Sequence, residues 1–163
     1  MREENNPGVV LLHPTACFMF RLMPVEELIP DSSQSSNPFV RAQAKDLIII
    51  APINDSDDPV SGGGSHWSLL VVDKHHRTAT HYDSCVGHNL RVARETTRCF
   101  EKLLGTSLAF VQPSNVKQQT NGYDCGVHAL MTFHQLYFAQ PPPAPEHAFR
   151  AHLLQLVLAE SRI

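Results

Sequence analysis

The sequence predicts an α+β fold in which helices pack against a mixed β-sheet. Short β-branched or alternating apolar runs, which are typical of strands, lie in the middle of the chain, and longer runs with apolar residues three or four positions apart are interleaved with them or follow them. The length of 163 residues suits one globular domain. Because strands and helices share one such domain, we expect a single mixed sheet with helices packed on it.

Four segments carry the strand pattern. Leu47 to Ala51 is a short apolar, β-branched run of the kind that is buried on both faces of a sheet. Trp67 to Asp73 and Thr78 to Asp83 follow, and the short link between them predicts an antiparallel hairpin. Ser107 to Gln112 is the fourth expected strand.

Three segments carry a helical pattern. In Leu90 to Leu104 apolar residues recur every three or four positions, and Gly105 stands where a helix C-cap is expected. Cys125 to Phe138 predicts an apolar helix, and Glu146 to Glu160 predicts an amphipathic one. The proline-rich stretch 141–145 between them cannot continue a helix and predicts an extended connector. Two further segments, 31–38 and 55–65, predict loops.

Composition and charge argue against several classes of protein. The net charge is −3 with neutral histidines, without the basic excess of a dedicated nucleic-acid binder. No apolar run approaches the ~20 residues that a membrane-spanning helix needs, and the charged start of the chain does not lead into a signal peptide. The four cysteines form no CxxC pair, which favours a reducing cytoplasmic or nuclear compartment and a catalytic role for any special cysteine: Cys17, Cys85, Cys99 and Cys125.

The segment QQTNGYDCGVH, residues 118–128, holds the strongest candidate for a nucleophile. Cys125 follows the turn signal Asn121-Gly122 and falls at the expected start of a helix. The partial positive charge at a helix N-terminus stabilises a thiolate, and Gly126 lets a substrate approach the backbone beside the sulfur. The alternative is a buried structural cysteine, which is the usual fate of a free cysteine.

A nucleophilic cysteine needs a base and a group that orients the base. His66 precedes the strand 67–73, and Asp83 ends the strand 78–83, so a hairpin would bring the two side chains together at its open end. The carboxylate would fix the imidazole tautomer and stabilise the imidazolium. Gln119, six residues before Cys125, is the candidate oxyanion donor.

Each of these residues has a simpler interpretation. His81 shares a strand face with Asp83 and competes with His66 for the role of base. Asp83 alone would be read as a turn cap, and Gln119 alone as a loop residue. The order His–Asp–Gln–Cys, on two strands, a loop and a helix start, favours the catalytic interpretation.

A zinc site is the other chemistry that the sequence suggests. Cys85 with His88 and Cys125 with His128 have the same C-x₂-H spacing. The first pair falls in a loop and the second on a helix, whereas a structural zinc site usually draws its ligands from two compact pairs. We therefore expect no metal and no other cofactor.

Three stretches of the chain resemble a known family. GGGSHWSLLVVD, HYDS and QQTNGYDCG resemble the sentrin-specific (SUMO-type) cysteine proteases, in particular the deneddylase branch, which acts on the Nedd-type ubiquitin-like modifier. The stretch IIIAPINDSDDPVSGGG resembles that branch too, and the resemblance as a whole spans roughly Asp46 to Tyr137. It implies a papain-like α+β fold with Cys125 as nucleophile, His66 as general base, Asp83 as its orienting residue and Gln119 as oxyanion donor. It also implies that Trp67 covers a narrow channel for a Gly-Gly tail, which excludes residues with side chains.

The resemblance also implies a domain organisation. Family members usually begin their domain with a helical segment that contains a Trp-Leu-Asn-Asp type motif, and this chain has one tryptophan and no such motif. We therefore expect a divergent or truncated N-terminal segment over residues 1–45 and a catalytic core over residues 46–140. Residues 141–163 would form a proline-rich connector and a C-terminal helix.

The activity implied by the resemblance is that of a cysteine peptidase or isopeptidase. It would cleave after the C-terminal Gly-Gly of a ubiquitin-like modifier, a Nedd-type one first, in deneddylation or precursor processing. Alternatives are a SUMO- or ubiquitin-directed protease, a catalytically weak module that binds a modifier, and an acyltransferase. The expected partners are the modifier and its conjugates, without nucleic acid or membrane, and we expect a monomer in the cytoplasm or nucleus.

Overall fold

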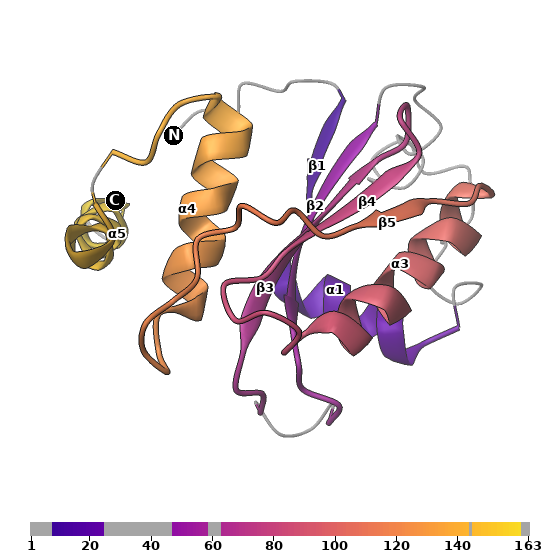
Figure 1. Cartoon of the computed structure of the whole chain (residues 1–163), viewed down its shortest axis with the longest axis horizontal. Helices are drawn as coiled ribbons and strands as arrows, with labels where there is room; N and C mark the ends of the chain where they lie inside the picture. Colours follow the sequence, from indigo (N-terminus) through magenta and orange to yellow (C-terminus); the bar gives the residue numbers. More distant parts are fainter. Residues whose placement is uncertain (1–7, 25–46, 59–62, 144, 161–163) are drawn as a thin grey trace.

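The computed structural model describes residues 8–24, 47–58, 63–143 and 145–160. In these residues five strands form one mixed sheet in the order β1-β2-β3-β4-β5, with helices on both faces (Figure 1), which confirms the α+β prediction. The strands are β1 (Val9–Leu11), β2 (Ile48–Asn54), β3 (Trp67–Asp73), β4 (Thr78–Tyr82) and β5 (Ala109–Val111). The helices are α1 (Pro14–Leu22), α3 (Leu90–Leu104), α4 (Cys125–Phe138) and α5 (Glu146–Glu160).

The centre of the sheet is antiparallel and its two edges are parallel. β3 pairs with β2 on one side and with β4 on the other, and the β3–β4 hairpin runs from the pair Asp73–Thr78 at the turn to Leu69–Tyr82 near the open end. β1 and β5 add parallel strands at the edges. The predicted hairpin is confirmed, and the fourth expected strand is shorter than predicted, because only three residues of 107–112 pair with β4.

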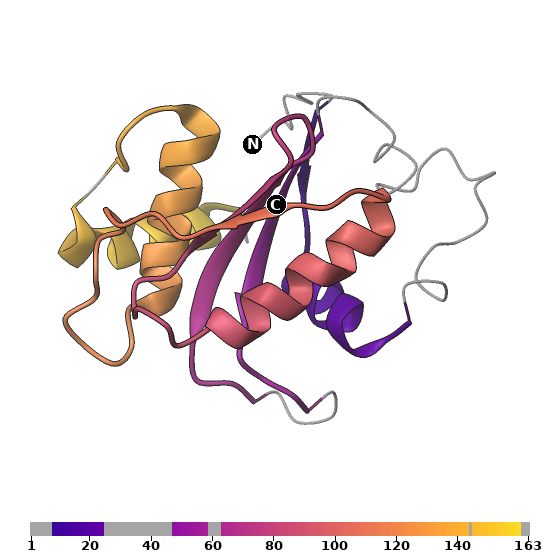
Figure 2. The same ribbon diagram turned by 45° about the vertical axis from the view of Figure 1, so that its right-hand side comes forward.

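Helices cover both faces of the sheet. α1 and α3 lie on one face, α4 packs along β3 on the other, and α5 lies against α4 on the side away from the sheet (Figures 1 and 2). Ile49 and Ile50 of β2 point to opposite faces, and both are at most 3% exposed. The prediction that this strand is buried on both faces is therefore confirmed.

Residues 8–24 fold onto the sheet. β1 pairs with β2, and α1 contacts both β2 and α3, where the rings of Phe20 and Phe100 lie 5.9 Å apart. Burial raises the pKa of the Cys17 thiol to about 12, which is the behaviour of a structural cysteine. The sequence did not predict β1 and α1, because three and nine residues are too short for a clear period. The loop predicted over residues 31–38 lies outside the described residues.

The three predicted helices begin and end where the sequence places them. Gly105 ends α3 in the left-handed conformation at φ 62°, as a C-cap glycine does. The prediction that α5 is amphipathic is wrong: Phe149 is buried, but Leu154, Leu156 and Leu158 are all more than 40% exposed. Apolar residues fill five of the six positions 153–158, so they cannot gather on one face. Within the described ranges, no helix has the length and apolar character needed to cross a bilayer.

Candidate active site

Three chain segments bring the predicted catalytic residues to one end of the central strands of the sheet. His66 immediately precedes β3 and Asp83 immediately follows β4, so the antiparallel hairpin places them at its open end. Cys125 is the first residue of α4, which packs against β3. In Figure 1 these strand ends lie at the bottom of the sheet, where α3 and α4 also begin.

The His66–Asp83 pair is formed and buried. His66 Nε2 lies 2.6 Å from Asp83 Oδ1, and the two side chains are 4% and 3% exposed. Asp83 also accepts the backbone N–H of Cys85 on Oδ1 at 2.9 Å and that of Asn89 on Oδ2 at 3.1 Å. Burial raises the pKa of the Asp83 carboxyl, but these hydrogen bonds outweigh burial and hold the pKa below its usual range. Asp83 is thus both a partner of His66 and a cap for the loop that follows β4.

His81, the competing base, lies inside the sheet and bonds elsewhere. It is 1% exposed, and its Nε2 lies 3.0 Å from Ser68 Oγ. Burial lowers the pKa of His81 to about 4, although the charge of Asp83 opposes that shift, so its ring is neutral at neutral pH. His66, rather than His81, is hydrogen-bonded to the Asp83 carboxylate, through Nε2. Its second ring nitrogen, Nδ1, is therefore the one that can exchange a proton with a nucleophile.

The backbone of His66 is held from both sides. Its N–H donates to Asp55 Oδ1 at 2.9 Å, and its carbonyl accepts from Asn54 Nδ2 at 3.1 Å and from Asn89 Nδ2 at 3.3 Å. Asn89 is fully buried. No sequence pattern marked these three residues: Asp55 falls in the stretch 55–65, which predicts only a loop, and Asn54 and Asn89 lie outside the predicted catalytic residues. An Asn-Asp pair directly after a buried strand is a signal that could have identified two of them.

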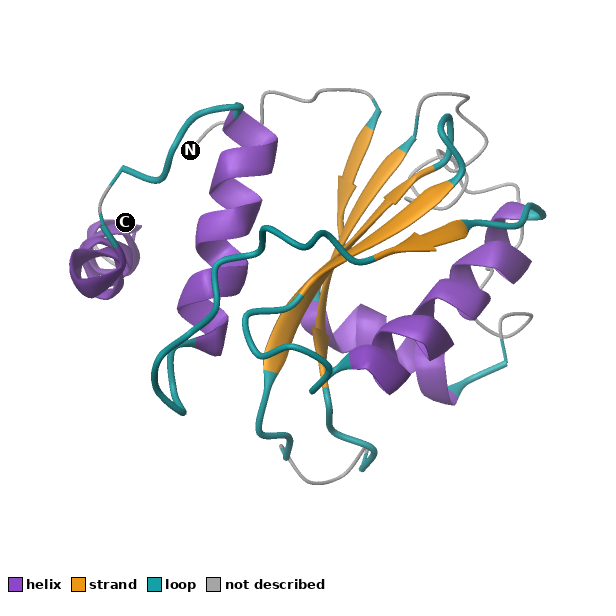
Figure 3. Ribbon diagram, viewed as in Figure 1, coloured by secondary structure: helices purple, strands orange, loops and turns teal. Residues whose placement is uncertain are grey.

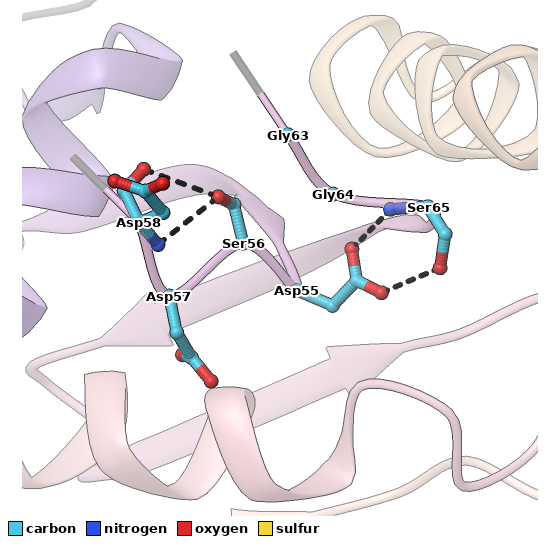
Figure 4. Close-up of a pocket in the computed structure, with 7 residues that line it drawn as sticks. All are labelled: Asp55, Ser56, Asp57, Asp58, Gly63, Gly64 and Ser65. Atoms are coloured by element: carbon cyan, nitrogen blue, oxygen red, sulfur yellow. Dashed lines mark hydrogen bonds between the residues drawn. The ribbon is translucent and has the colours of Figure 1, made fainter. Parts of the chain in front are cut away.

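The acidic loop after β2 is held by bonds within the protein. Residues 55–58 and 63–65 line an open pocket of about 630 Å³, shown in Figure 4. Asp55 accepts the N–H of Ser65 at 2.6 Å and its hydroxyl at 2.7 Å, and Asp57 pairs with Arg21 of α1 at 3.1 Å and Arg91 of α3 at 2.7 Å. Burial raises the pKa of Asp55, but hydrogen bonds from Ser65 and the His66 N–H lower it far below its usual range. The carboxylates of Asp55 and Asp57 therefore support the loop next to His66.

Gly64 lies in this loop at a position where a side chain would meet Asn54. Its φ is +98°, and a Cβ built there would lie 1.9 Å from Oδ1 of Asn54. Asn54 uses that oxygen to accept the N–H of Ser56 at 2.9 Å while its amide nitrogen donates to the His66 carbonyl. A side chain at position 64 would have to displace the Asn54 amide that supports His66 and also adopt a left-handed backbone.

Cys125 stands at the N-terminus of α4, as predicted, and is 7% exposed. Asn121 organises the turn before it: Oδ1 accepts the N–H groups of Tyr123 at 3.1 Å and Asp124 at 3.0 Å, and Nδ2 donates to Asp124 Oδ2 at 2.7 Å. Arg150 of α5 donates to the other oxygen of Asp124. Since Asp124 does not cap α4 with its side chain, the positive end of the helix is left beside the thiol.

Gln119 and Trp67 flank this arrangement. The segment between β5 and α4 is a long loop, drawn teal in Figure 3, and by its position in the sequence Gln119 belongs to it. Its Oε1 accepts from Ser84 Oγ at 2.8 Å, and its Nε2 donates to the Asn121 carbonyl at 2.6 Å. That bond uses one of the two amide N–H groups, so the role of Gln119 as oxyanion donor stays a prediction. Trp67, the first residue of β3, is 37% exposed.

The histidines considered for zinc have other partners. His88 Nε2 lies 3.4 Å from Asp55 Oδ2, and His128 Nε2 lies 3.1 Å from Glu146 Oε1. In the described part of the chain, no three His, Cys, Asp or Glu side chains come together as a metal would need.

A mixed sheet that carries a His–Asp pair at one edge, with a cysteine at the start of the facing helix, defines the class of papain-like cysteine peptidase domains. Within that class the chain belongs to the Ulp1 protease family, since residues 17–150 match its C-terminal catalytic domain. This match confirms the family resemblance drawn from the three sequence motifs.

Individual relatives agree with the family. The chain is 34% identical over 131 residues to NEDD8-specific protease 1 of Arabidopsis thaliana, covering 79% of this chain and 56% of that protein. It is 31% identical over 134 residues to the probable sentrin-specific protease 8 of Dictyostelium discoideum, covering 78% and 54%. The chain thus spans about half the length of these relatives. The solved structure of the SUMO protease Ulp1 with its catalytic cysteine oxidised to a sulfenic acid shares the fold, with a TM-score of 0.68 and 17% identity over 98% of this chain and 72% of that one.

Proposed function

We propose that this chain is a cysteine peptidase or isopeptidase that cleaves after the C-terminal Gly-Gly of a Nedd-type ubiquitin-like modifier. The observation that carries the proposal is the buried His66–Asp83 pair at 2.6 Å, at the edge of the sheet where α4 begins with Cys125. The similarity to NEDD8-specific protease 1 of Arabidopsis thaliana supports the choice of modifier. The chain's partners would be this modifier and its conjugates.

In the proposed mechanism, Cys125 is the nucleophile and His66 moves the proton. The thiolate at the positive end of α4 attacks the carbonyl carbon of the last glycine, while Asp83 stabilises the imidazolium of His66. The oxyanion of the tetrahedral intermediate accepts from the Cys125 backbone N–H and from the Gln119 amide. The C–N bond breaks as His66 gives its proton to the leaving amine. His66 then takes a proton from water, whose oxygen attacks the thioester and frees the carboxylate and the thiol.

Selectivity for Gly-Gly would come from Trp67. Its indole adjoins His66 in the chain and is 37% exposed, so it can lie over an extended peptide that enters the site. A flat ring over the backbone leaves no room for a Cβ, and a tail of two glycines is the sequence that fits under it. Which modifier presents that tail would depend on surfaces away from these residues.

The proposal is tested with mechanism-based probes. The purified chain is incubated with vinyl-type or aldehyde probes built on the Nedd-type modifier, on SUMO and on ubiquitin, beside the Cys125→Ala variant. We expect labelling by the Nedd-type probe that is lost in Cys125→Ala, and cleavage of a Nedd-type conjugate by the unmodified chain alone. The alanine variant removes one sulfur and should keep its fold, which circular dichroism checks.

Other results would change the assignment. Labelling by the SUMO or ubiquitin probe alone would keep the chemistry and replace the modifier. A folded chain that binds the Nedd-type modifier without labelling or cleavage would be a binding module. Turnover that persists in Cys125→Ala would contradict the proposed nucleophile.

A further inference from the structure

A second imidazole lies against the ring of His66. The centroids of the His66 and His88 rings are 4.6 Å apart, with their planes inclined at 43°. His88 belongs to the loop between Asp83 and α3, and its side chain is 44% exposed, whereas that of His66 is only 4% exposed. His88 is therefore an exposed ring in tilted contact with the buried ring of His66.

His88 is tied to the carboxylate that holds the His66 backbone. Its Nε2 lies 3.4 Å from Asp55 Oδ2 and 3.4 Å from Ser65 Oγ, while Asp55 Oδ1 accepts the His66 N–H at 2.9 Å. Asn89, which directly follows His88, donates its N–H to Asp83 Oδ2 and so joins the end of this loop to its start. The Asp55 carboxylate thus links the His88 side chain to His66, and the Asp83 carboxylate links the loop that carries His88 to His66.

The bond to Asp83 alone does not fix the ring of His66. A single hydrogen bond at Nε2 restrains rotation of the ring about the Cβ–Cγ bond, but the ring plane can still rock about that bond. A flat group against one face removes that freedom. Among the described residues, Asp83 after β4, Asp55 after β2 and His81 within β4 interact with His66 through hydrogen bonds or charge, and His88 contacts its ring.

We propose that His88 is a positioning residue for the reaction: its ring supports one face of His66 and, held by Asp55, keeps Nδ1 aimed at the nucleophile. This inference rests on the proposed function, because it assigns His66 the proton transfer. Nothing in the family motifs quoted above includes His88, which lies five residues beyond Asp83.

The test compares His88→Phe, His88→Gln and His88→Ala with the unmodified chain. Phe keeps a flat ring without the bond to Asp55, Gln keeps a hydrogen-bonding group without a ring, and Ala removes both. His76→Ala is the matched control, since His76 is also a histidine paired with an aspartate, Asp73, at the far end of the same hairpin. Each variant is assayed for kcat and KM on a Nedd-type conjugate, and for the rate at which iodoacetamide alkylates Cys125, quantified by peptide mass spectrometry.

We expect His88→Ala and His88→Gln to lower kcat about 10–100-fold with KM unchanged, because misplacement of a catalytic group by about 1 Å can cost about 10²-fold. Alkylation of Cys125 should slow in the same two variants. His88→Phe keeps the ring but loses its bond to Asp55, so in both assays it should lose clearly less than His88→Ala, and His76→Ala should match the unmodified chain.

Two results would overturn the inference while leaving the proposed function intact: His88→Ala with unchanged kcat, or a loss in His88→Phe as large as in His88→Ala. The alkylation assay separates this from failure of the proposed function. If Cys125 of the unmodified chain reacts no faster than Cys99, whose thiol pKa is raised by burial, there is no activated thiolate and both proposals fall.

Discussion

The β3–β4 hairpin carries a histidine–aspartate pair at each end, and the two pairs differ in almost everything but composition. At the open end His66 and Asp83 lie 2.6 Å apart with side chains 4% and 3% exposed. At the turn His76 and Asp73 lie 2.8 Å apart with side chains 71% and 26% exposed. Each aspartate also accepts backbone N–H groups, that of His76 in one case and those of Cys85 and Asn89 in the other.

The comparison shows that surroundings, rather than the pair itself, determine what such a pair can do. Water competes for both members of the turn pair, so His76 and Asp73 stabilise a turn and little more. At the open end water is excluded, and the attraction between carboxylate and imidazole acts at a lower dielectric. Only there does a helix N-terminus with a cysteine lie at the same edge of the sheet.

The largest difference should appear when each aspartate is removed. We expect Asp83→Ala to lower kcat on a Nedd-type conjugate by about 10²–10⁴-fold, since the orienting carboxylate of a triad has effects of that size. Asp73→Ala should leave kcat within two-fold. Steady-state kinetics on folded samples measures both, and equal losses in the two variants would contradict the distinction between the ends.

Burial should also affect how the stability of the chain depends on pH, because His81, near the His66–Asp83 pair, is buried and titratable. Its pKa is lowered by burial from 6.5 to about 4, so the unfolded chain takes up a proton at a higher pH than the folded one. The stability that depends on neutral His81 is fully present above about pH 6.5 and is lost as the pH falls toward about 4. Thermal unfolding between pH 7 and 4 should therefore show a steeper fall in Tm for the unmodified chain than for His81→Gln. Parallel curves would contradict this.

The pair Arg150–Asp124 allows the effect of lying next to the nucleophile to be measured separately from the effect of burial. It is exposed like the turn pair, with the arginine side chain 60% exposed, yet Asp124 directly precedes Cys125. We expect Arg150→Ala to lower kcat several-fold by loosening the start of α4, with little change in the midpoint of urea unfolding, because exposed pairs contribute little to stability. Kinetics together with urea denaturation distinguishes the two effects. A loss as large as that in Asp83→Ala would show that burial is not the deciding factor.

The smallest effect should come from breaking the turn pair. His76→Ala removes an exposed pair three residues apart, and pairs of this kind contribute about 0–1 kcal/mol. We expect a change in Tm of no more than a few degrees and unchanged cleavage. A clear loss of activity would mean that the two ends of the hairpin are coupled.

The sequence predicted what is local and periodic. The hairpin, the bounds of α3, α4 and α5, and the meeting of His66 with Asp83 follow from alternation, helical spacing and the geometry of two paired strands. The cysteine at a helix start was likewise predictable, since a turn signal precedes it and an apolar run follows.

What the sequence did not predict depends on contacts between distant segments. The His66 backbone is held by Asn54, Asp55 and Asn89, which come together because β2, β3 and the start of α3 reach the same end of the sheet. Polar loop residues have no sequence periodicity from which such a contact could be predicted. The contact of His88 with His66 is of the same kind. β1 and α1 were missed because they are stabilised by packing on β2, rather than by a pattern of their own.

Gly64 limits which sequences this loop can accept, although glycine has no side chain that could take part in the reaction. Every other amino acid would place a Cβ on Asn54, which holds the carbonyl of His66, and would also have to adopt a φ of +98°. In a library that samples all twenty residues at each site, we expect position 64 to be as restricted as those of the nucleophile and base, although no atom of Gly64 takes part in bond making. Evolutionary drift in the loop before the base would then have to leave this glycine in place.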